Sequence, residues 1–211
     1  MPIRLKGVIF DYGNVLCARQ QRADVEAMAA VFDAPAAAFE QAYWVRRDVF
    51  DAAALTPEEY WGEIARALGR GLDERMLADA TAIDNRSWSH PSQVMAQWAT
   101  AIRGAGLRTA ILSNMPITLR MHLDDQVKWL PEFDHRTFSC DVKVAKPRPE
   151  IFEHCIAGLG TAPEETIFLD DREENIRAAA AMGWRTLLFH DAEQAQRELA
   201  GKFELPLPIV G

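Results

Sequence analysis

The chain reads Gly7-Val8-Ile9-Phe10-Asp11-Tyr12-Gly13-Asn14 near its N-terminus, a short apolar run rich in β-branched residues and closed by a carboxylate. Such a run is typical of a buried strand in a parallel sheet, because both faces of that strand are covered. We expect Gly13 to let the backbone turn sharply after the strand. Ligands of parallel α/β sheets bind beyond the carboxyl ends of the strands, so Asp11 is the first candidate for a functional residue.

Three later segments repeat the pattern of an apolar run that ends in polar residues. They are residues 108–112 before Ser113-Asn114, residues 166–169 before Asp170-Asp171, and residues 185–189 before His190-Asp191. Helical patterns cover residues 150–159 and 175–182, and the spacing of Asp191 and Gln194 indicates a capping box that starts a last helix. Strands that alternate with helices predict right-handed βαβ units. The sequence therefore predicts an α/β fold with a Rossmann-like, doubly wound parallel sheet.

Residues 18–90 break this alternation, because they show helical periodicity and no convincing strand. The clearest signal is Thr56-Pro57-Glu58-Glu59, with a cap residue, proline at the first helical position and glutamate three residues after the cap. Val94, Trp98 and Ile102 then predict a helix that leads back to the sheet. We expect a core domain of residues 1–17 and 91–211, and an all-helical cap of residues 18–90 over the strand ends, where it would select substrates.

The composition is that of an ordinary globular protein, which excludes intrinsic disorder as the main state. The chain has 211 residues, of which 49% are apolar and 26% charged, and at about 150 residues per domain it has room for one sizeable domain with an insertion. Its 23 Lys and Arg against 31 Asp and Glu give a net charge of −8, and its longest basic cluster is the pair Arg46-Arg47. We therefore expect no nucleic-acid partner, whereas a small anion bound to a metal is compatible with this charge.

The three cysteines, Cys17, Cys140 and Cys155, are odd in number and lack CxxC spacing, which argues against a disulfide framework and a zinc site. No apolar stretch approaches the roughly 18 residues that a spanning helix needs. We expect a cytoplasmic protein that keeps its N-terminus and does not enter a membrane. The sequence makes no prediction of the oligomeric state.

Polar residues near the expected strand ends supply candidates for chemistry. Ser113 and Asn114 offer a hydroxyl, an amide and main-chain N–H groups suited to phosphate oxygens, although Ser-Asn is also a common turn. Lys146 precedes an expected helix, where its charge would neutralise an aspartate or a phosphoryl group. Lys143 is a rival for that role.

Carboxylates are the other candidates. Asp11 would attack phosphorus or carbon as a nucleophile, unless it merely caps a turn. Asp170 and Asp171 are adjacent carboxylates at a strand end, an unfavourable arrangement unless a cation or hydrogen-bond donors offset their repulsion. Magnesium is the natural cation for oxygen ligands combined with phosphate.

Four ordered motifs span nearly the whole chain. They are Phe10-Asp11-Tyr12-Gly13-Asn14-Val15-Leu16, Leu112-Ser113-Asn114, Val144-Ala145-Lys146-Pro147-Arg148-Pro149-Glu150-Ile151-Phe152, and Phe168-Leu169-Asp170-Asp171 followed by Asn175. In this order they resemble the haloacid dehalogenase (HAD) superfamily of aspartate-nucleophile hydrolases, in the subclass with a helical cap after the first motif. Within it, the chain is similar to sugar-phosphate phosphatases that begin Asp-x-Gly-Asn-Val and to the phosphatase domain of bifunctional epoxide hydrolases.

The resemblance implies a magnesium-dependent phosphatase that acts on a small phosphate ester, with a sugar phosphate as the first expectation. It implies that Asp11 attacks phosphorus to form an aspartyl-phosphate, which water hydrolyses, while Ser113, Asn114 and Lys146 hold the phosphoryl oxygens. It also implies that Mg²⁺ is bound by the Asp11 side chain, the Gly13 carbonyl and the Asp171 side chain, with Asp170 either a direct ligand or a neighbour of one.

One position departs from the pattern that the resemblance implies. Phosphatases of the superfamily usually carry a second aspartate two residues after the nucleophile, and that position is Gly13. This general acid protonates the leaving oxygen and later activates water, work generally worth about 10²–10⁴ in rate. Three outcomes stay open: a substrate with a good leaving group, a proton supplied by a cap residue or water, or a weak or inactive relative that serves as a binding protein.

A 2-haloacid dehalogenase is the alternative enzyme, using Asp11 against carbon without a metal. The Asp170-Asp171 pair argues against it, because its substrate is itself a carboxylate and nothing would offset the repulsion. Such enzymes usually carry tyrosine two residues after the nucleophile, whereas Tyr12 is one position early and is expected on the opposite face of the strand.

The expected cap contains an aromatic and basic cluster, which comprises Tyr43, Trp44, Arg46, Arg47 and Phe50. Aromatic residues at helical spacing are usually core, and arginines on a helix are usually solvated. Arg46 and Arg47 are nevertheless the candidates for cap contacts with the substrate.

Overall fold

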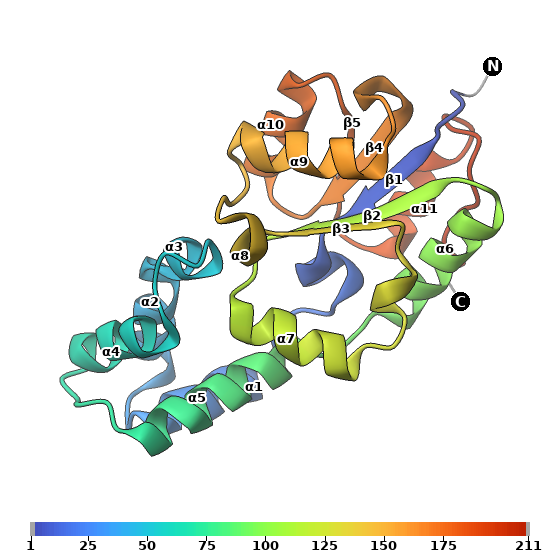
Figure 1. Ribbon diagram of the computed structural model, residues 1–211. Coiled ribbons are helices and arrows are strands. Elements are labelled where there is room, and N and C mark those ends of the chain that lie inside the picture. The colour runs from blue at the N-terminus through green and yellow to red at the C-terminus, as the bar shows by residue number, and fades with distance from the viewer. Residues whose placement is uncertain (1–2, 210–211) are drawn as a thin grey trace.

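The computed structural model describes residues 3–209, and its centre is a five-stranded parallel sheet (Figure 1). The strands are β1 (Gly7–Phe10), β2 (Arg108–Ser113), β3 (His135–Phe138), β4 (Thr166–Asp170) and β5 (Arg185–Leu188). Their order is β3-β2-β1-β4-β5, with Gly7 beside Arg108 on one side and Thr166 on the other. Because β1 is central, Asp11 emerges in the middle of the carboxyl edge. The predicted α/β fold with a parallel sheet is confirmed.

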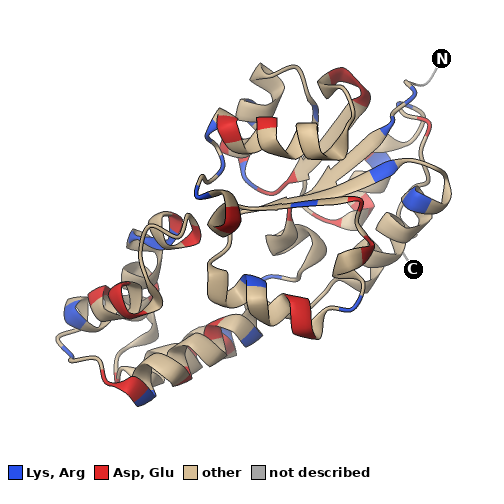
Figure 2. Ribbon diagram, in the orientation of Figure 1, with Lys and Arg blue, Asp and Glu red and all other residues tan. Residues whose placement is uncertain are grey.

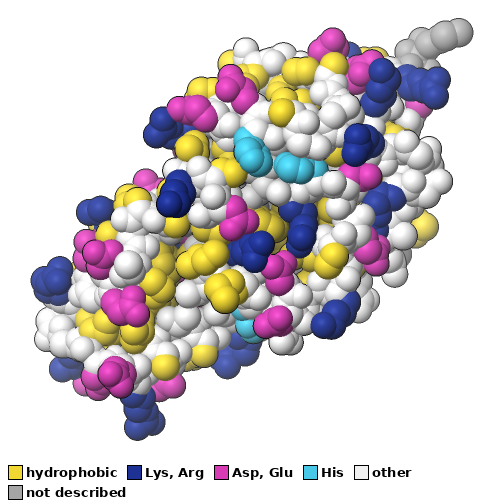
Figure 3. Space-filling view, in the orientation of Figure 1, with side chains coloured by type: hydrophobic (Ala, Val, Ile, Leu, Met, Phe, Trp, Pro, Cys, Tyr) yellow, Lys and Arg dark blue, Asp and Glu magenta, His cyan; other side chains and the backbone are white. Residues whose placement is uncertain are grey.

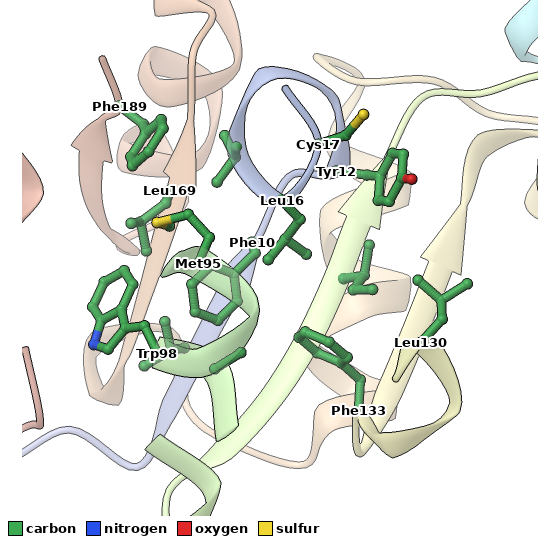
Figure 4. Close-up of a cluster of buried hydrophobic side chains, with 14 of the residues drawn as sticks. Phe10, Tyr12, Leu16, Cys17, Met95, Trp98, Leu130, Phe133, Leu169 and Phe189 are labelled. Atoms are coloured by element: carbon green, nitrogen blue, oxygen red, sulfur yellow. The ribbon is translucent and has the colours of Figure 1, made fainter. Parts of the chain in front are cut away.

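Helices cover both faces of the sheet. Helices α9 (Pro149–Leu159) and α10 (Glu173–Ala181) lie on one face, and α6 (Gln93–Gly104), α7 (Ile117–Gln126) and α11 (Ala192–Leu199) lie on the other (Figure 1). Successive residues of a strand point to opposite faces. Phe10 therefore packs with Trp98 of α6 and with Phe133 (Figure 4), whereas Ile9 packs with residues of α9 and α10. The sheet is thus covered on both sides, as its apolar strands require.

Most predicted elements of the sheet region are present with small shifts of their bounds. The helix predicted at residues 175–182 starts earlier, at Glu173, and Asp191 accepts a hydrogen bond from the Gln194 main-chain N–H at 2.7 Å. The Gln194 side chain does not return that bond to Asp191, because its Oε1 accepts from the His190 N–H at 3.2 Å. β3 was not predicted. Short helical segments complete this region: η1 (Tyr12–Leu16), η2 (Leu130–Glu132), α8 (Ser139–Val142) and η3 (Pro163–Glu165).

The chain between η1 and α6 contains five helices, which have a hydrophobic core of their own. They are α1 (Arg22–Val31), α2 (Ala36–Val45), α3 (Arg47–Asp51), α4 (Pro57–Ala67) and α5 (Glu74–Ser87). Phe32, Phe39, Tyr60 and Trp61 are buried in that core. The capping box predicted for α4 is present, with Thr56 and Glu59 bonded reciprocally. These helices extend from the sheet region toward the lower left of Figure 1.

The two connections between the helices and the sheet region run side by side. Cys17 pairs with Pro91 in an antiparallel bridge. The Ala18 N–H donates to the His90 carbonyl, and the Ser92 N–H donates to the Leu16 carbonyl, both at 2.8 Å. We propose that this crossing separates a core domain of residues 1–17 and 91–211 from a cap domain of residues 18–90.

Charged positions of both signs are distributed over both parts of the molecule (Figure 2). On the face shown in Figure 3, hydrophobic side chains gather over the cap helices and beside their junction with the sheet region. Within residues 3–209, no helix has the length and apolar character needed to cross a membrane.

Candidate active site

The turn after β1 places the Asp11 carboxylate at the carboxyl edge of the sheet. The Asp11 N–H donates to the Leu169 carbonyl of β4 at 2.9 Å, and its Oδ1 accepts from the Tyr12 N–H at 2.6 Å. The sharp bend was expected at Gly13, but Gly13 has an ordinary φ of −62° and Asn14 has the left-handed φ of 59°. The chain does turn sharply here, with the angles of a type II turn at Gly13 and Asn14, but the left-handed residue is Asn14, because asparagine also tolerates that region.

Lys146 holds two carboxylates together beneath this turn. Its Nζ lies 3.0 Å from Asp11 Oδ1 and 2.6 Å from Asp170 Oδ2, and donates to the Leu112 carbonyl at 2.9 Å. These three contacts match the three donors of an ammonium group, and the side chain is buried. Lys143, the rival candidate, is exposed. The structure therefore brings Lys146, and not Lys143, to Asp11.

Asn114 and Ser113 lie at the end of β2, beside this lysine. The Asn114 side chain donates to the Lys146 carbonyl at 3.0 Å and accepts from the Lys146 N–H at 2.8 Å. Both polar atoms of this amide thus hold the main chain at Lys146. The sequence predicted a different role for Asn114, that of binding the phosphoryl oxygens. Ser113 is buried and borders the same cavity as Asp11.

Three carboxylates meet at this edge. Asp11, Asp170 and Asp171 each offer an oxygen, and these oxygens lie within 4.8 Å of one another. Asp170 is fully buried, and both of its oxygens accept hydrogen bonds, from the Arg172 N–H at 2.8 Å, from Asn175 Nδ2 at 3.0 Å and from Lys146. Asp171 is less buried. Its Oδ2 accepts from Asn14 Nδ2 at 2.8 Å.

The electrostatics of the cluster favour a cation. Burial raises the pKa of Asp11 to about 7, the charge of Lys146 lowers it, and the charges of Asp170 and Asp171 raise it. The single charge of Lys146 therefore does not fully compensate three adjacent carboxylates. A divalent cation among their oxygens would lower the pKa of Asp11 and remove the remaining repulsion.

The polar atoms around the cluster fit a hydrated magnesium ion. The side-chain oxygens of Asn14 and Asn175 are buried and have no hydrogen-bond partner among residues 3–209. Mg²⁺ binds carboxylate oxygens and keeps several of its waters, which would donate to such acceptors. The residues that fit as ligands are Asp11, Asp171 and the Gly13 carbonyl, with Asp170 holding Lys146 and Asn175.

A cavity of about 110 Å³ opens over Asp11. Its walls combine the residues above with cap residues Trp44, Arg47, Asp51 and Trp88 and with apolar residues Met115 and Leu119. Drug-sized sites measure ~300–1,000 Å³, so this one accommodates a small group. Trp44 is 49% exposed. Sequence reasoning missed Asp51, Trp88, Met115 and Leu119, because single residues in helices and loops carry no periodic signal that separates a cavity wall from ordinary packing.

The two arginines predicted to contact substrate occupy different places. Arg47 is buried and borders the cavity, with Nε 2.7 Å from Asp51 Oδ1 and Nη1 3.1 Å from Asp84 Oδ2. Arg46 borders a separate groove between α2 and α4, together with Val45 and Ile64. The structure therefore brings Arg47, and not Arg46, to the site.

A protein family and several known proteins resemble this chain in sequence. The family model of the haloacid dehalogenase-like hydrolases matches residues 5–183. Bifunctional epoxide hydrolase 2 of Mus musculus is 31% identical over 164 residues, which are 72% of this chain and 29% of the relative. Acyl-CoA dehydrogenase family member 10 of Mus musculus is 37% identical over 120 residues, 55% of this chain and 11% of the relative. The chain thus spans less than a third of either relative.

Among solved structures, a HAD family enzyme of Bacteroides thetaiotaomicron in complex with magnesium and inorganic phosphate superposes with a TM-score of 0.66. It is 22% identical, and the match covers 87% of this chain and 93% of that one. This likeness concerns the fold. The family match over most of the chain confirms the resemblance found in the four motifs, and the chain belongs to the haloacid dehalogenase-like hydrolases.

Proposed function

We propose that this hydrolase is a magnesium-dependent phosphatase of small phosphate monoesters. The observation that carries the proposal is the Lys146 ammonium, which lies between Asp11 and Asp170 while Asp171 completes a cluster of three carboxylates. A phosphate group brings further negative charge to this place, and only a site that binds a cation accommodates it. The comparison structure that binds magnesium and phosphate supports the proposal by its fold.

The roles of the residues follow from their contacts. Asp11 Oδ2 attacks phosphorus, because Oδ1 is held by the Tyr12 N–H and Lys146. The resulting aspartyl-phosphate is hydrolysed by water, which restores the carboxylate. Bound Mg²⁺ supplies positive charge next to the phosphoryl oxygens. Ser113 borders the cavity as a hydroxyl donor to those oxygens, and Lys146, fixed by Asn114, orients Asp11 and favours its ionised form.

The walls of the cavity limit the substrate. Its small volume admits the phosphate, and the ester group extends toward Trp44 and Trp88. Indole rings present flat apolar faces that pack against sugar or aromatic rings. A sugar phosphate therefore stays the first substrate in the panel, beside aryl phosphates.

The test is steady-state hydrolysis of p-nitrophenyl phosphate and of a sugar-phosphate panel, with magnesium or with a chelator. We expect turnover that needs magnesium and is lost in Asp11→Asn. Turnover that persists in Asp11→Asn would refute the role of Asp11. If the folded wild-type protein hydrolyses no phosphate ester, the phosphatase proposal fails; chloride release from 2-chloropropionate then tests dehalogenation, and activity on neither class points to a binding protein.

A further inference from the structure

The cavity wall next to the nucleophile contains no carboxyl at Gly13. A Cβ placed on Gly13 would lie 3.5 Å from Trp88 Cζ3, so the indole of Trp88 closes this side. The Trp88 carbonyl accepts from the Tyr12 hydroxyl at 3.0 Å, and the Trp88 Nε1–H donates to the Tyr43 hydroxyl at 3.2 Å. The proton that an alkoxide leaving group needs must therefore come from another side chain that borders the cavity.

Most polar side chains around the cavity are already committed. All three Lys146 donors are used, and the Tyr12 hydroxyl donates to the Trp88 carbonyl, with its pKa raised by burial. Asp11 and Asp171 belong to the carboxylate cluster. Among the described residues that border the cavity, this leaves one carboxyl outside the cluster, that of Asp51.

Asp51 is held at both its side chain and its main chain. Its Oδ1 accepts from Arg47 Nε at 2.7 Å, and its main-chain carbonyl accepts from Ser139 Oγ at 2.5 Å. Ser139 also accepts from the Met115 N–H at 2.9 Å, which joins the end of α3 to the loop after β2. The second carboxyl oxygen, Oδ2, makes no hydrogen bond within residues 3–209. Asp51 thus borders the cavity and has one carboxyl oxygen outside the hydrogen bonds of the described residues.

We propose that Asp51 is the general acid and base of the reaction, in place of the missing carboxyl at position 13. This inference rests on the proposed phosphatase function. As Asp11 forms its bond to phosphorus and the bond to the ester oxygen breaks, the proton on Asp51 Oδ2 passes to that oxygen and releases the alcohol. In the second half, water attacks phosphorus and gives a proton to Asp51, the bond to Asp11 breaks, and inorganic phosphate leaves.

The surroundings of Asp51 suit a proton donor near neutral pH. Burial raises its pKa to about 6, Arg47 lowers it, and the charges of Asp84 and Asp48 raise it. The titratable groups whose charges interact with Asp51 are Arg47 and Asp48 of α3, Tyr60 of α4, Asp84 of α5 and Cys140 of α8. Next to them, Tyr43 of α2 bonds to Arg47 and Asp84, and Asp141 of α8 interacts with Cys140. Arg47 then compensates the carboxylate left after proton transfer, which makes it a positioning residue.

The test compares two esters in Asp51→Asn. A sugar 6-phosphate has an alkoxide leaving group that needs a proton, and p-nitrophenyl phosphate does not. We expect kcat/KM for the sugar phosphate, which reports the transfer of the phosphoryl group to Asp11, to fall by about 10² or more, as for loss of a general acid. The value of kcat/KM for the aryl ester should be nearly unchanged, because its leaving group needs no proton. The matched control is Asp33→Asn, which removes an exposed cap carboxylate that pairs with Arg70 and does not border the cavity. Its ratio of kcat/KM for the sugar phosphate to kcat/KM for the aryl ester should equal that of the wild type.

Wild-type pH profiles provide a readout that does not depend on a variant. We expect kcat/KM of the wild type for the sugar phosphate to fall as the pH rises above about 6. This decrease should be absent for the aryl ester, and it should be absent for the sugar phosphate in Asp51→Asn. An equal loss of kcat/KM on both esters would assign Asp51 a structural role and overturn the proposal, as would an unchanged kcat/KM for the sugar phosphate. If the wild type hydrolyses neither ester, the phosphatase function itself is refuted, which is a distinct result from either outcome at Asp51.

Discussion

Replacing Lys146 by methionine tests the buried charge cluster directly. The variant keeps most of the side-chain volume and leaves Asp11 and Asp170 without their shared cation. Removing one partner of a buried ion pair costs about 3–5 kcal/mol, and the lost bond to the Leu112 carbonyl adds about 1 kcal/mol. Asp170 retains the Arg172 and Asn175 donors, so we place the total near 4 kcal/mol. For a chain of this size this lowers the melting temperature by about 8–16 °C.

The loss should depend on pH in a defined direction. Burial raises the pKa of Asp11 to about 7 and Lys146 lowers it, so the variant has a still higher value. An acid whose folded pKa exceeds its unfolded value loses stability as the pH rises between the two values. In the wild type the loss of stability with rising pH ends near pH 7, the folded pKa of Asp11. In the variant the folded pKa is higher, so stability continues to fall above pH 7. The loss is therefore larger at pH 8 than at pH 6.

Urea denaturation at both pH values measures the free energy of unfolding, with an unchanged m-value as the condition for comparison. Lys143→Met is the matched control, because Lys143 is exposed on the same loop, and it should lie within about 0.5 kcal/mol of the wild type. A loss below about 1 kcal/mol for Lys146→Met at pH 8 is the value expected for a solvent-exposed pair. That result would refute the buried cluster.

Three other measurements examine the site and its support. Asp11→Asn removes a desolvated charge as well as the nucleophile, so turnover should vanish while the melting temperature at pH 8 rises; a lower melting temperature would contradict the raised pKa of Asp11. Because Asp11 must be ionised to bind a cation, Mg²⁺ affinity measured by calorimetry should increase about 10-fold from pH 6 to pH 8, and an affinity independent of pH would argue against Asp11 as a ligand. Gly158→Ala should destabilise the protein in urea, although alanine usually stabilises a helix by about 1 kcal/mol, because its Cβ would enter the His135 ring; unchanged stability would show that the ring moves aside.

The central strands could be predicted because their physics is local. β1 and β4 are buried along their whole length, so their sequences are unbroken apolar runs that end in aspartate. β3 lies at the edge of the sheet and contains His135 and Arg136, both half-buried, so no apolar run marks it. β5 lies at the other edge of the sheet, and its apolar run Leu187-Leu188-Phe189 made it predictable.

The site was predictable in its strand-end residues and less so elsewhere. Asp11, Lys146 and Asp170 follow from motif spacing. The positions of Arg46 and Arg47 depend instead on an interruption of the helix between them. Arg46 separates α2 from α3, and this break turns Arg47 inward toward Asp51. Helical periodicity does not foresee such a break. Asp51 also gave no signal, because its place at the cavity that Asp11 borders results from the packing of helices that are distant in sequence from β1.

The paired connections at Cys17 and Pro91 bear on how quickly this chain folds. β1 and β2 are neighbours in the sheet, although Phe10 and Arg108 are 98 positions apart. If the cap helices form first, the bridge between Cys17 and Pro91 closes their segment and shortens the flexible loop to about a quarter of that length. The free-energy cost of closing the loop then falls by about 1.2 kcal/mol, which corresponds to roughly eightfold faster pairing. A preformed cap would therefore let β1 and β2 pair about as fast as two strands that are much closer in sequence.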